Sequence, residues 1–301
     1  MPGKPPFGPI LAATFMSPDP EASARDYVAH LDQIVVDRRP VPRELAQLWG
    51  APAVAGRPMV LMRPRSAEPG WIRIVQGDQA PAPFSTYGWT SMEILVRDAD
   101  ATSRRLKGTP FREIGEPHDL GVVKGVRAMQ AVGRAGEVLY LTHRDEVQRF
   151  RCRHVMGDVD RIFIMVLGAA DYDKARRFYE DNFAVGIGID VKTAQPLMTK
   201  ALGIPTAEQR RMCTLLLTGG QEVVAKIQLD EHPNVAKVRP RQAGDLPGGV
   251  ATVTFEVPRM DDLKLSFLQP PMVIGEPPYD GRKVAMCVGG AGELIELAAR
   301  S

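Results

Sequence analysis

The stretch IFIMVLGAADYDKARRFYEDNF, residues 162–183, contains the pattern of a strand followed by a helix. Its apolar run at 162–169 has the length and composition of a buried strand. Asp171 is suited to an N-cap, and Tyr179 and Phe183 then lie at helical spacing with other apolar residues. The pattern predicts a buried strand and an amphipathic helix at the start of a structural unit.

The segments that follow are typical of strands and turns. Residues 210–231 predict two strands around a Gly-Gly turn. A second unit begins with the apolar strand pattern at 248–257, and 258–268 predicts its short helix. KVAMCVGGAGELIELAA, residues 283–299, predicts a closing hairpin.

The chain repeats this order of segments. WGAPAVAGRPMVLM, residues 49–62, matches LGIPTAEQRRMCTL, residues 202–215, at an offset of 153. The other matching pairs are 19–27 with 171–179, 114–117 with 274–277, and 135–141 (AGEVLYL) with 291–297 (AGELIEL). Four matches in the same order indicate a tandem duplication. The halves are 1–145 and 155–301, joined by a charged stretch at 143–154, and each half predicts two β-α-β-β-β modules.

The strand followed by DYDKARRFYEDNF, and the closing GGAGELIELAA at 289–299, resemble the vicinal oxygen chelate superfamily. Its members include glyoxalase I, bleomycin-resistance proteins, fosfomycin-resistance enzymes, methylmalonyl-CoA epimerase and extradiol dioxygenases. The resemblance implies an α+β fold of four βαβββ modules, paired into two tandem glyoxalase-like cup-shaped domains. We expect the first cup in 1–145 and the second in 155–301, an order similar to that of extradiol dioxygenases.

Composition narrows the class of protein. The 301 residues are typical of two domains. Lys and Arg total 38 against 36 Asp and Glu, a net charge of +2 that favours neither nucleic acid nor a membrane surface as partner. No apolar run reaches the roughly 18–20 residues of a membrane span. Cys152, Cys213 and Cys287 are far apart and are expected to be free thiols in a reducing compartment, so we expect a soluble cytoplasmic protein.

The resemblance also implies a divalent metal held by His and Glu or Gln on strands inside a cup. Glu296 matches the glutamate of the dioxygenase members. The matching positions near 162–164 and at Ala251 hold no ligand, and Tyr140 takes the glutamate's place in the first cup. The histidines lie elsewhere, at His30, His118, His143, His154 and His232. We therefore expect no metal and no other cofactor.

In the second cup the resemblance points Glu296 into an apolar cavity near Ala251 and Met286. A carboxylate in such surroundings is a candidate general base. The alternatives are that Glu296 pairs with an arginine, or that it is a remnant of a lost metal site.

In the first cup, Thr90, His118, Gln130 and Tyr140 are candidates to converge on a ligand. Histidine moves protons near neutral pH, and tyrosine can polarise a substrate oxygen. Alternatively, His118 lies in an exposed loop and Tyr140 packs in the core.

Two arginines recur at equivalent positions before a strand, Arg57 and Arg210. A fold-supporting salt bridge is the simpler interpretation, and a clamp on a substrate carboxylate is the alternative.

Three functions stay open at this point. The first is a metal-independent lyase or isomerase acting by proton transfer on a fairly large, apolar, oxygenated small molecule such as an aromatic catabolite, with His118, Tyr140 and Glu296 as catalytic candidates. The second is a non-catalytic small-molecule binding protein of the bleomycin-resistance type. The third is an extradiol dioxygenase-like metalloenzyme with displaced ligands. Edge strands make a homodimer plausible in each case.

Overall fold

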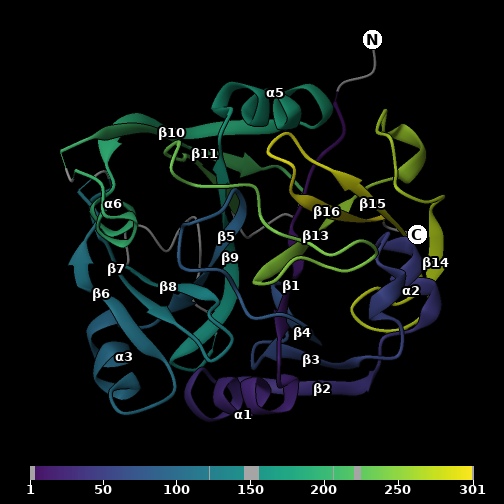
Figure 1. Cartoon of the computed structure of the whole chain (residues 1–301), viewed down its shortest axis with the longest axis horizontal. Helices are drawn as coiled ribbons and strands as arrows, with labels where there is room; N and C mark the ends of the chain where they lie inside the picture. The colour runs from purple at the N-terminus through teal and green to yellow at the C-terminus, as the bar shows by residue number, and fades with distance from the viewer. Residues whose placement is uncertain (1–3, 122, 146–155, 206, 220–224, 300–301) are drawn as a thin grey trace.

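Four modules follow one another along the chain (Figure 1); three have the order β-α-β-β-β, and in the fourth a single 3₁₀ turn stands in place of the helix. The computed structural model describes residues 4–121, 123–145, 156–205, 207–219 and 225–299. Most of the charged stretch predicted to join the halves, and part of the Gly-Gly turn at 219–220, lie outside these residues.

The first two modules come from the first half of the chain. The first comprises β1 (Ile10–Ser17), α1 (Pro20–His30), β2 (Gln33–Pro40), α2 (Arg43–Leu48), η1 (Pro52–Val54), β3 (Pro58–Pro64) and β4 (Trp71–Gln76). The second comprises β5 (Gly88–Val96), α3 (Ala99–Leu106), β6 (Arg112–Asp119), β7 (Val126–Val132) and β8 (Val138–Arg144).

The other two modules repeat this order. The third comprises β9 (Val159–Ala169), α5 (Tyr172–Asn182), β10 (Val185–Ala194), α6 (Pro196–Leu202), β11 (Gln209–Leu217) and β12 (Lys226–Glu231). The fourth comprises β13 (Val250–Val257), η2 (Met260–Asp262), β14 (Met272–Ile274), β15 (Arg282–Val288) and β16 (Leu294–Ala299).

The modules pair across the two halves of the chain. One eight-stranded sheet has the order β14-β15-β16-β13-β1-β4-β3-β2, and the other has β10-β11-β12-β9-β5-β8-β7-β6. We name the two cups by their order along the chain. The first sheet, from the first and fourth modules, is the outer cup, and the second sheet, β5–β12 from the second and third modules, is the inner cup. The α+β fold of two cups is as the sequence predicts. The expectation that each cup forms within 1–145 or within 155–301 is wrong, because β1 pairs with β13 and β5 with β9.

A repeated buried contact joins the two modules of each half. The Tyr27 hydroxyl donates to Glu137 at 3.0 Å, and the Tyr179 hydroxyl donates to Glu293 at 2.6 Å. Both pairs come from motifs of the duplication, one on the first helix of a half and the other on its last hairpin. These contacts therefore join the two modules within each half, whereas each cup is built from one module of the first half and one module of the second.

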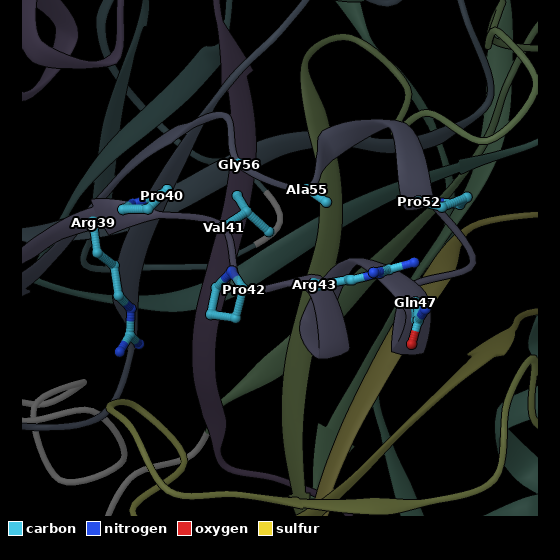
Figure 2. Close-up of a pocket in the computed structure, with 9 residues that line it drawn as sticks. All are labelled: Arg39, Pro40, Val41, Pro42, Arg43, Gln47, Pro52, Ala55 and Gly56. Carbon is cyan, nitrogen blue, oxygen red and sulfur yellow. The ribbon is translucent and has the colours of Figure 1, made fainter.

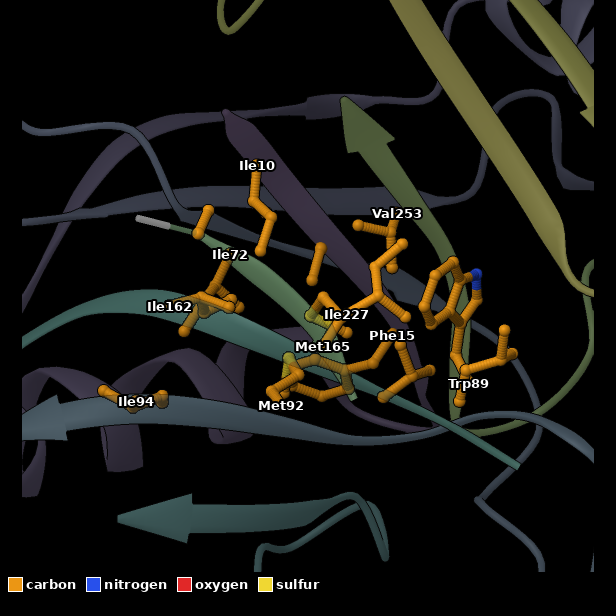
Figure 3. Packing of buried hydrophobic residues seen from close by; sticks show 14 of the residues in the cluster. Ile10, Phe15, Ile72, Trp89, Met92, Ile94, Ile162, Met165, Ile227 and Val253 are labelled. Atoms are coloured by element: carbon orange, nitrogen blue, oxygen red, sulfur yellow. The ribbon is translucent and has the colours of Figure 1, made fainter. Parts of the chain in front are cut away.

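The two sheets share one apolar core. Figure 3 shows side chains of both cups packed together, with Phe15 and Val253 from the outer cup close to Met92 and Met165 from the inner cup. Alternate residues of each strand point into this core, so the opposite residues face the concave side of a cup. The core thereby fixes which side chains are available for a site.

The segment expected as a helix at 258–268 is extended after the single turn η2. Leu263, Leu265 and Phe267 pack against the core at a spacing of two, which suits extended backbone rather than a helix. Edge strands β2, β6 and β10 carry mixed, half-exposed side chains and give no clear strand pattern in the sequence. No helix among the described residues is long and apolar enough to cross a membrane.

Candidate functional site

The concave side of the outer cup is filled by the chain itself. The segment from α2 through η1 packs on it, and Trp49 at its centre is fully buried. In the duplication Trp49 takes the place of Leu202, the last residue of α6 at the inner cup. A large indole thus occupies one cup where the other has a smaller aliphatic side chain.

Four donors surround Glu296 at the centre of the outer cup. Trp49 Nε1 donates to its Oε1 at 2.6 Å, and the Tyr279 hydroxyl donates to the same oxygen at 2.7 Å. The Arg73 guanidinium donates to Oε2 at 2.9 Å, and the Thr254 hydroxyl also donates to Oε2. Arg73 and Glu296 have exposed side-chain fractions of 1% and 0%.

These contacts favour a structural role for Glu296 over the general-base role expected from the sequence. Both carboxylate oxygens are engaged by protein donors, and the charge is compensated by Arg73. The expected neighbours Ala251 and Met286 are part of the apolar packing of this cup rather than the walls of an open cavity. The alternative of a buried pair with an arginine is the one the structure shows.

A hollow of about 680 Å³ remains outside this packed segment (Figure 2). It is lined mainly by residues of β2, α2 and η1, among them Arg39, Arg43 and Gln47. Arg57, a substrate-binding candidate nearby in the chain, instead makes a bidentate pair with Asp245 at 2.7 and 3.0 Å. Its repeat partner Arg210 pairs with Glu208 at 2.7 Å.

The inner cup is open. Its concave side holds a cavity of about 1160 Å³, lined by strands of both its modules and by α6. Leu197 and Met198 of α6 pack beside Val132, Val138 and Tyr140, so this helix of the third module forms a wall against strands of the second. Its volume is slightly above the roughly 300–1,000 Å³ that is usual for small-molecule sites, so it has room for a fairly large ligand.

Strand pairing sets the floor of the cavity. Tyr140 on β8 lies opposite Glu93 on β5 and opposite Gln130 on β7. Glu93 and Gln130 are each 4% exposed, and all three line the cavity. Among the described residues, the Gln130 Oε1 atom has no hydrogen-bond partner, so an acceptor in the floor is available to a ligand.

Asp230 on β12 is the second buried carboxyl group of the floor. It accepts hydrogen bonds from the Gln228 amide at 3.1 and 3.2 Å and from the Gln195 amide at 3.2 Å. Burial raises the pKa of Asp230 to about 7, and the nearby Glu93 adds to this, against the lowering effect of the two amides. The group therefore changes protonation near neutral pH, as an acid–base catalyst must.

The neighbouring groups respond to the same surroundings. Burial raises the pKa of Glu93, opposed by Thr142 and by the charges of Lys226 and Arg144. Burial, together with Asp230 and Glu93, also raises the pKa of Tyr140, so the phenol stays protonated and can donate.

The structure brings three of the four candidates of the predicted first cup together. His118, Gln130 and Tyr140 all line the inner-cup cavity. His118 is exposed on β6, with Nδ1 2.8 Å from the Glu116 carbonyl oxygen. Thr90 is apart from them, since its hydroxyl donates to the Val166 carbonyl at 3.3 Å beside a cavity of only about 20 Å³.

Sequence reasoning missed Glu93, Gln228 and Asp230. Carboxyl groups inside the apolar strand patterns of β5 and β12 were a usable signal, because a buried charge needs a reason. The pairing of β5–β8 with β9–β12 was not expected, so nothing placed Gln228 and Asp230 beside Tyr140. Glu93 belongs to the same module as Tyr140, and its buried carboxyl group was the signal that could have found it.

The residues present do not fit the metal centre that the resemblance implies. Within the described ranges, no group of three or more His, Cys, Asp or Glu side chains could hold a metal ion. In the outer cup a fixed cation, the Arg73 guanidinium, already sits on the matching Glu296.

No family model and no curated protein sequence matches the chain. Several solved structures match nearly the whole chain in fold. Glyoxalase I from Zea mays superposes with a TM-score of 0.61 at 15% identity, covering 96% of this chain and 92% of that one. A putative dioxygenase from Bacillus subtilis gives 0.65 at 14% identity, covering 99% of this chain and 86% of that one. The chain has the vicinal oxygen chelate fold. At such identities the likeness establishes the vicinal oxygen chelate architecture alone, and the chemistry has to be argued from the cups.

Proposed function

We propose that the inner cup binds a small, largely apolar, oxygenated molecule and catalyses a proton transfer on it without a metal, as a lyase or isomerase. The observation that supports this most is Asp230, a buried carboxyl group with a pKa of about 7 in the floor of a cavity of about 1160 Å³. A group that titrates near the working pH is suited to take and return a proton.

The other groups of the floor have complementary roles in this proposal. Tyr140 stays protonated and donates to a substrate oxygen, stabilising the charge that develops there. Gln130 accepts a hydrogen bond and orients the ligand. His118, on the rim, exchanges protons with solvent. Apolar side chains such as Phe163 and Met198 form part of the remaining surface, beside charged groups such as Lys200.

Non-catalytic binding is the second candidate, and the outer cup favours it. The concave face of that cup holds side chains of the chain itself, Trp49 and Arg73, in fixed contacts and leaves neither oxygen of Glu296 free for chemistry. An inner cup of the same kind would sequester its ligand unchanged.

The test is proton exchange on a bound ligand. Ligands found by thermal-shift screening with chelator present are incubated with the protein in D2O, and loss of C–H signal is followed by NMR. We expect exchange that Asp230→Asn slows by about 100-fold or more, while Tyr140→Phe slows it less.

The matched control is Glu231→Gln, which changes the adjacent carboxylate that pairs with Arg211 away from the cavity. Exchange that survives in Asp230→Asn contradicts the proton-transfer proposal. Tight binding with no exchange in the unaltered protein supports the binding function instead.

A further inference from the structure

The duplication provides a comparison of the two cups within one molecule. Leu61 and Thr214 are equivalent at the offset of 153. Leu61 lies opposite Arg73, and Thr214 lies opposite Gln228. The Arg73 position of the outer cup is therefore that of Gln228 in the inner cup.

The same offset relates Asp230 to a residue of the outer cup. Met59 and Met212 are equivalent, and they lie opposite Val75 and Asp230. Asp230 therefore replaces an apolar side chain of the outer cup.

The strands from the other module complete the comparison. Glu296 and Tyr140 are equivalent in the AGELIEL and AGEVLYL repeats. Their partners on the neighbouring strand are Thr254 and Glu93. Glu93 therefore replaces a neutral hydroxyl.

The charge balance of the two cups consequently differs. In the outer cup one cation, Arg73, is matched by one carboxylate, Glu296. In the inner cup the Gln228 amide stands at the position of the cation, and the carboxyl groups of Asp230 and Glu93 stand where the outer cup has Val75 and Thr254. Glu93 has Lys226 and Arg144 nearby, whereas the hydrogen bonds to Asp230 come from neutral amides.

We infer that the ligand of the inner cup carries a cationic N–H donor, an ammonium, amidinium or guanidinium group, that is bound by Asp230 as Arg73 is bound in the outer cup. This inference rests on one part of the proposed function, that the inner cup binds a small molecule, and names the class of that molecule. The catalytic part is separate, because a cation paired with the Asp230 carboxylate lowers its pKa and makes it a weaker base.

The outer cup shows how the fold holds such a group. The Arg73 guanidinium carbon lies 4.7 Å from the centre of the Trp49 ring and 5.5 Å from that of Tyr279, with the Glu296 carboxylate at its edge. Aromatic faces and a carboxylate together are a recognised environment for a planar cation.

The inner cup offers the same kinds of group at other positions of the fold. The carboxylate is Asp230 and the aromatic ring is Tyr140, both lining the cavity. Gln130, 4% exposed, adds an acceptor atom that has no hydrogen-bond partner among the described residues. It lies on β7, separated from β12 and Asp230 by β9, β5 and β8, so a second polar N–H elsewhere on the ligand would pair with it.

The experiment compares three probes of one shape by calorimetry: benzamidine, a cation, benzamide, which is neutral, and benzoate, an anion. Chelator is present, the pH is about 8 so that Asp230 is ionised, and the salt is about 0.15 M. We expect benzamidine to bind about tenfold or more tightly than benzamide, with benzoate weakest, because a charge-assisted hydrogen bond is the stronger one.

Two variants locate this preference. Asp230→Asn should reduce the benzamidine-to-benzamide ratio to about one. Gln228→Arg should place the outer cup's cation in the inner cup and weaken benzamidine by about tenfold or more. Glu231→Gln is the control and should leave the ratio unchanged, and circular dichroism checks that each variant is folded.

The outcomes separate the two claims. Benzamide or benzoate binding as tightly as benzamidine to the unaltered protein overturns the inference, while binding in the cavity still stands. A cation preference that persists in both Asp230→Asn and Gln228→Arg also overturns it. A preference that behaves as expected, without proton exchange on any ligand, supports the inference and removes only the catalytic part of the proposed function.

Discussion

Replacing Glu296 with glutamine changes one atom at the centre of the outer cup and should destabilise the whole chain. The Oε1 atom faces the indole N–H of Trp49, and Oε2 faces the guanidinium of Arg73. Both are groups that only donate. Whichever way the new amide turns, its NH2 group meets one of them.

The magnitude follows from burial. Arg73 and Glu296 are 1% and 0% exposed, so the substitution leaves an uncompensated charge in the interior. Removing one partner of a buried pair costs about 3–5 kcal/mol. The slope of the unfolding free energy against urea concentration should be at or above the range of small proteins, so this loss should lower the urea concentration at the unfolding midpoint by roughly 1 M.

The assay is urea unfolding followed by circular dichroism and tryptophan fluorescence. Removing both charges together, with Arg73→Met and Glu296→Leu, should recover most of the loss, since apolar replacement of a buried pair is often neutral. Glu93→Gln in the inner cup is the matched control. Burial raises the pKa of that carboxyl group, so losing its charge should be neutral or stabilising.

The reasoning is refuted if Glu296→Gln unfolds at the same urea concentration as the unaltered protein. If that variant also loses proton exchange on a bound ligand, Glu296 is the general base that the sequence led us to expect.

Three further predictions concern other buried groups. Burial lowers the pKa of His232 to about 4, so between about pH 7 and 5 only the unfolded chain gains a proton there. Over that range the unfolding free energy of the unaltered protein should fall by about 2 kcal/mol relative to that of His232→Gln, measured by urea titration at each pH. Equal pH slopes for the two proteins would contradict this. A Cβ at Gly115 would lie 2.0 Å from Gln130 Oε1, the end of a flexible side chain, so Gly115→Ala should weaken benzamidine binding in calorimetry with little change in the unfolding midpoint. Tyr179→Phe removes the donor to Glu293, whose pKa burial raises to about 7, and should cost about 1–3 kcal/mol of unfolding free energy, more as the pH rises through 7 because the carboxyl group is then ionised. An equal loss of unfolding free energy at low and high pH would show that the Tyr179 hydroxyl does not stabilise the ionised Glu293 carboxylate.

The sequence predicts the modules well and their pairing not at all. Each module begins with a fully buried strand, as in β1, β5, β9 and β13, and these apolar patterns are readable. The edge that each strand offers to a partner is backbone, which carries no sequence signal. Which module completes which cup is therefore decided only by the packed structure.

The site divides in the same way. Tyr140 is placed by its alignment with Glu296, and Gln130 and His118 by their positions in the same module. Asp230 and Gln228 belong to the other half of the chain, and only the pairing of β9 with β5 brings them to the same floor. The filling of the outer cup depends on Trp49, and nothing in the sequence distinguishes its indole from that of an ordinary core residue.

The nesting of one cup inside the other along the chain has a consequence for biosynthesis. All strands of the inner cup lie between Gly88 and Glu231, so a growing polypeptide can assemble it while β13–β16 are still being made. The outer cup joins Arg73 to Glu296 across 223 residues and closes only when β16 has emerged. A chain interrupted before β16 would therefore leave Arg73 without its carboxylate partner and the apolar face of the first module uncovered, exposed to the cell's proteases and chaperones.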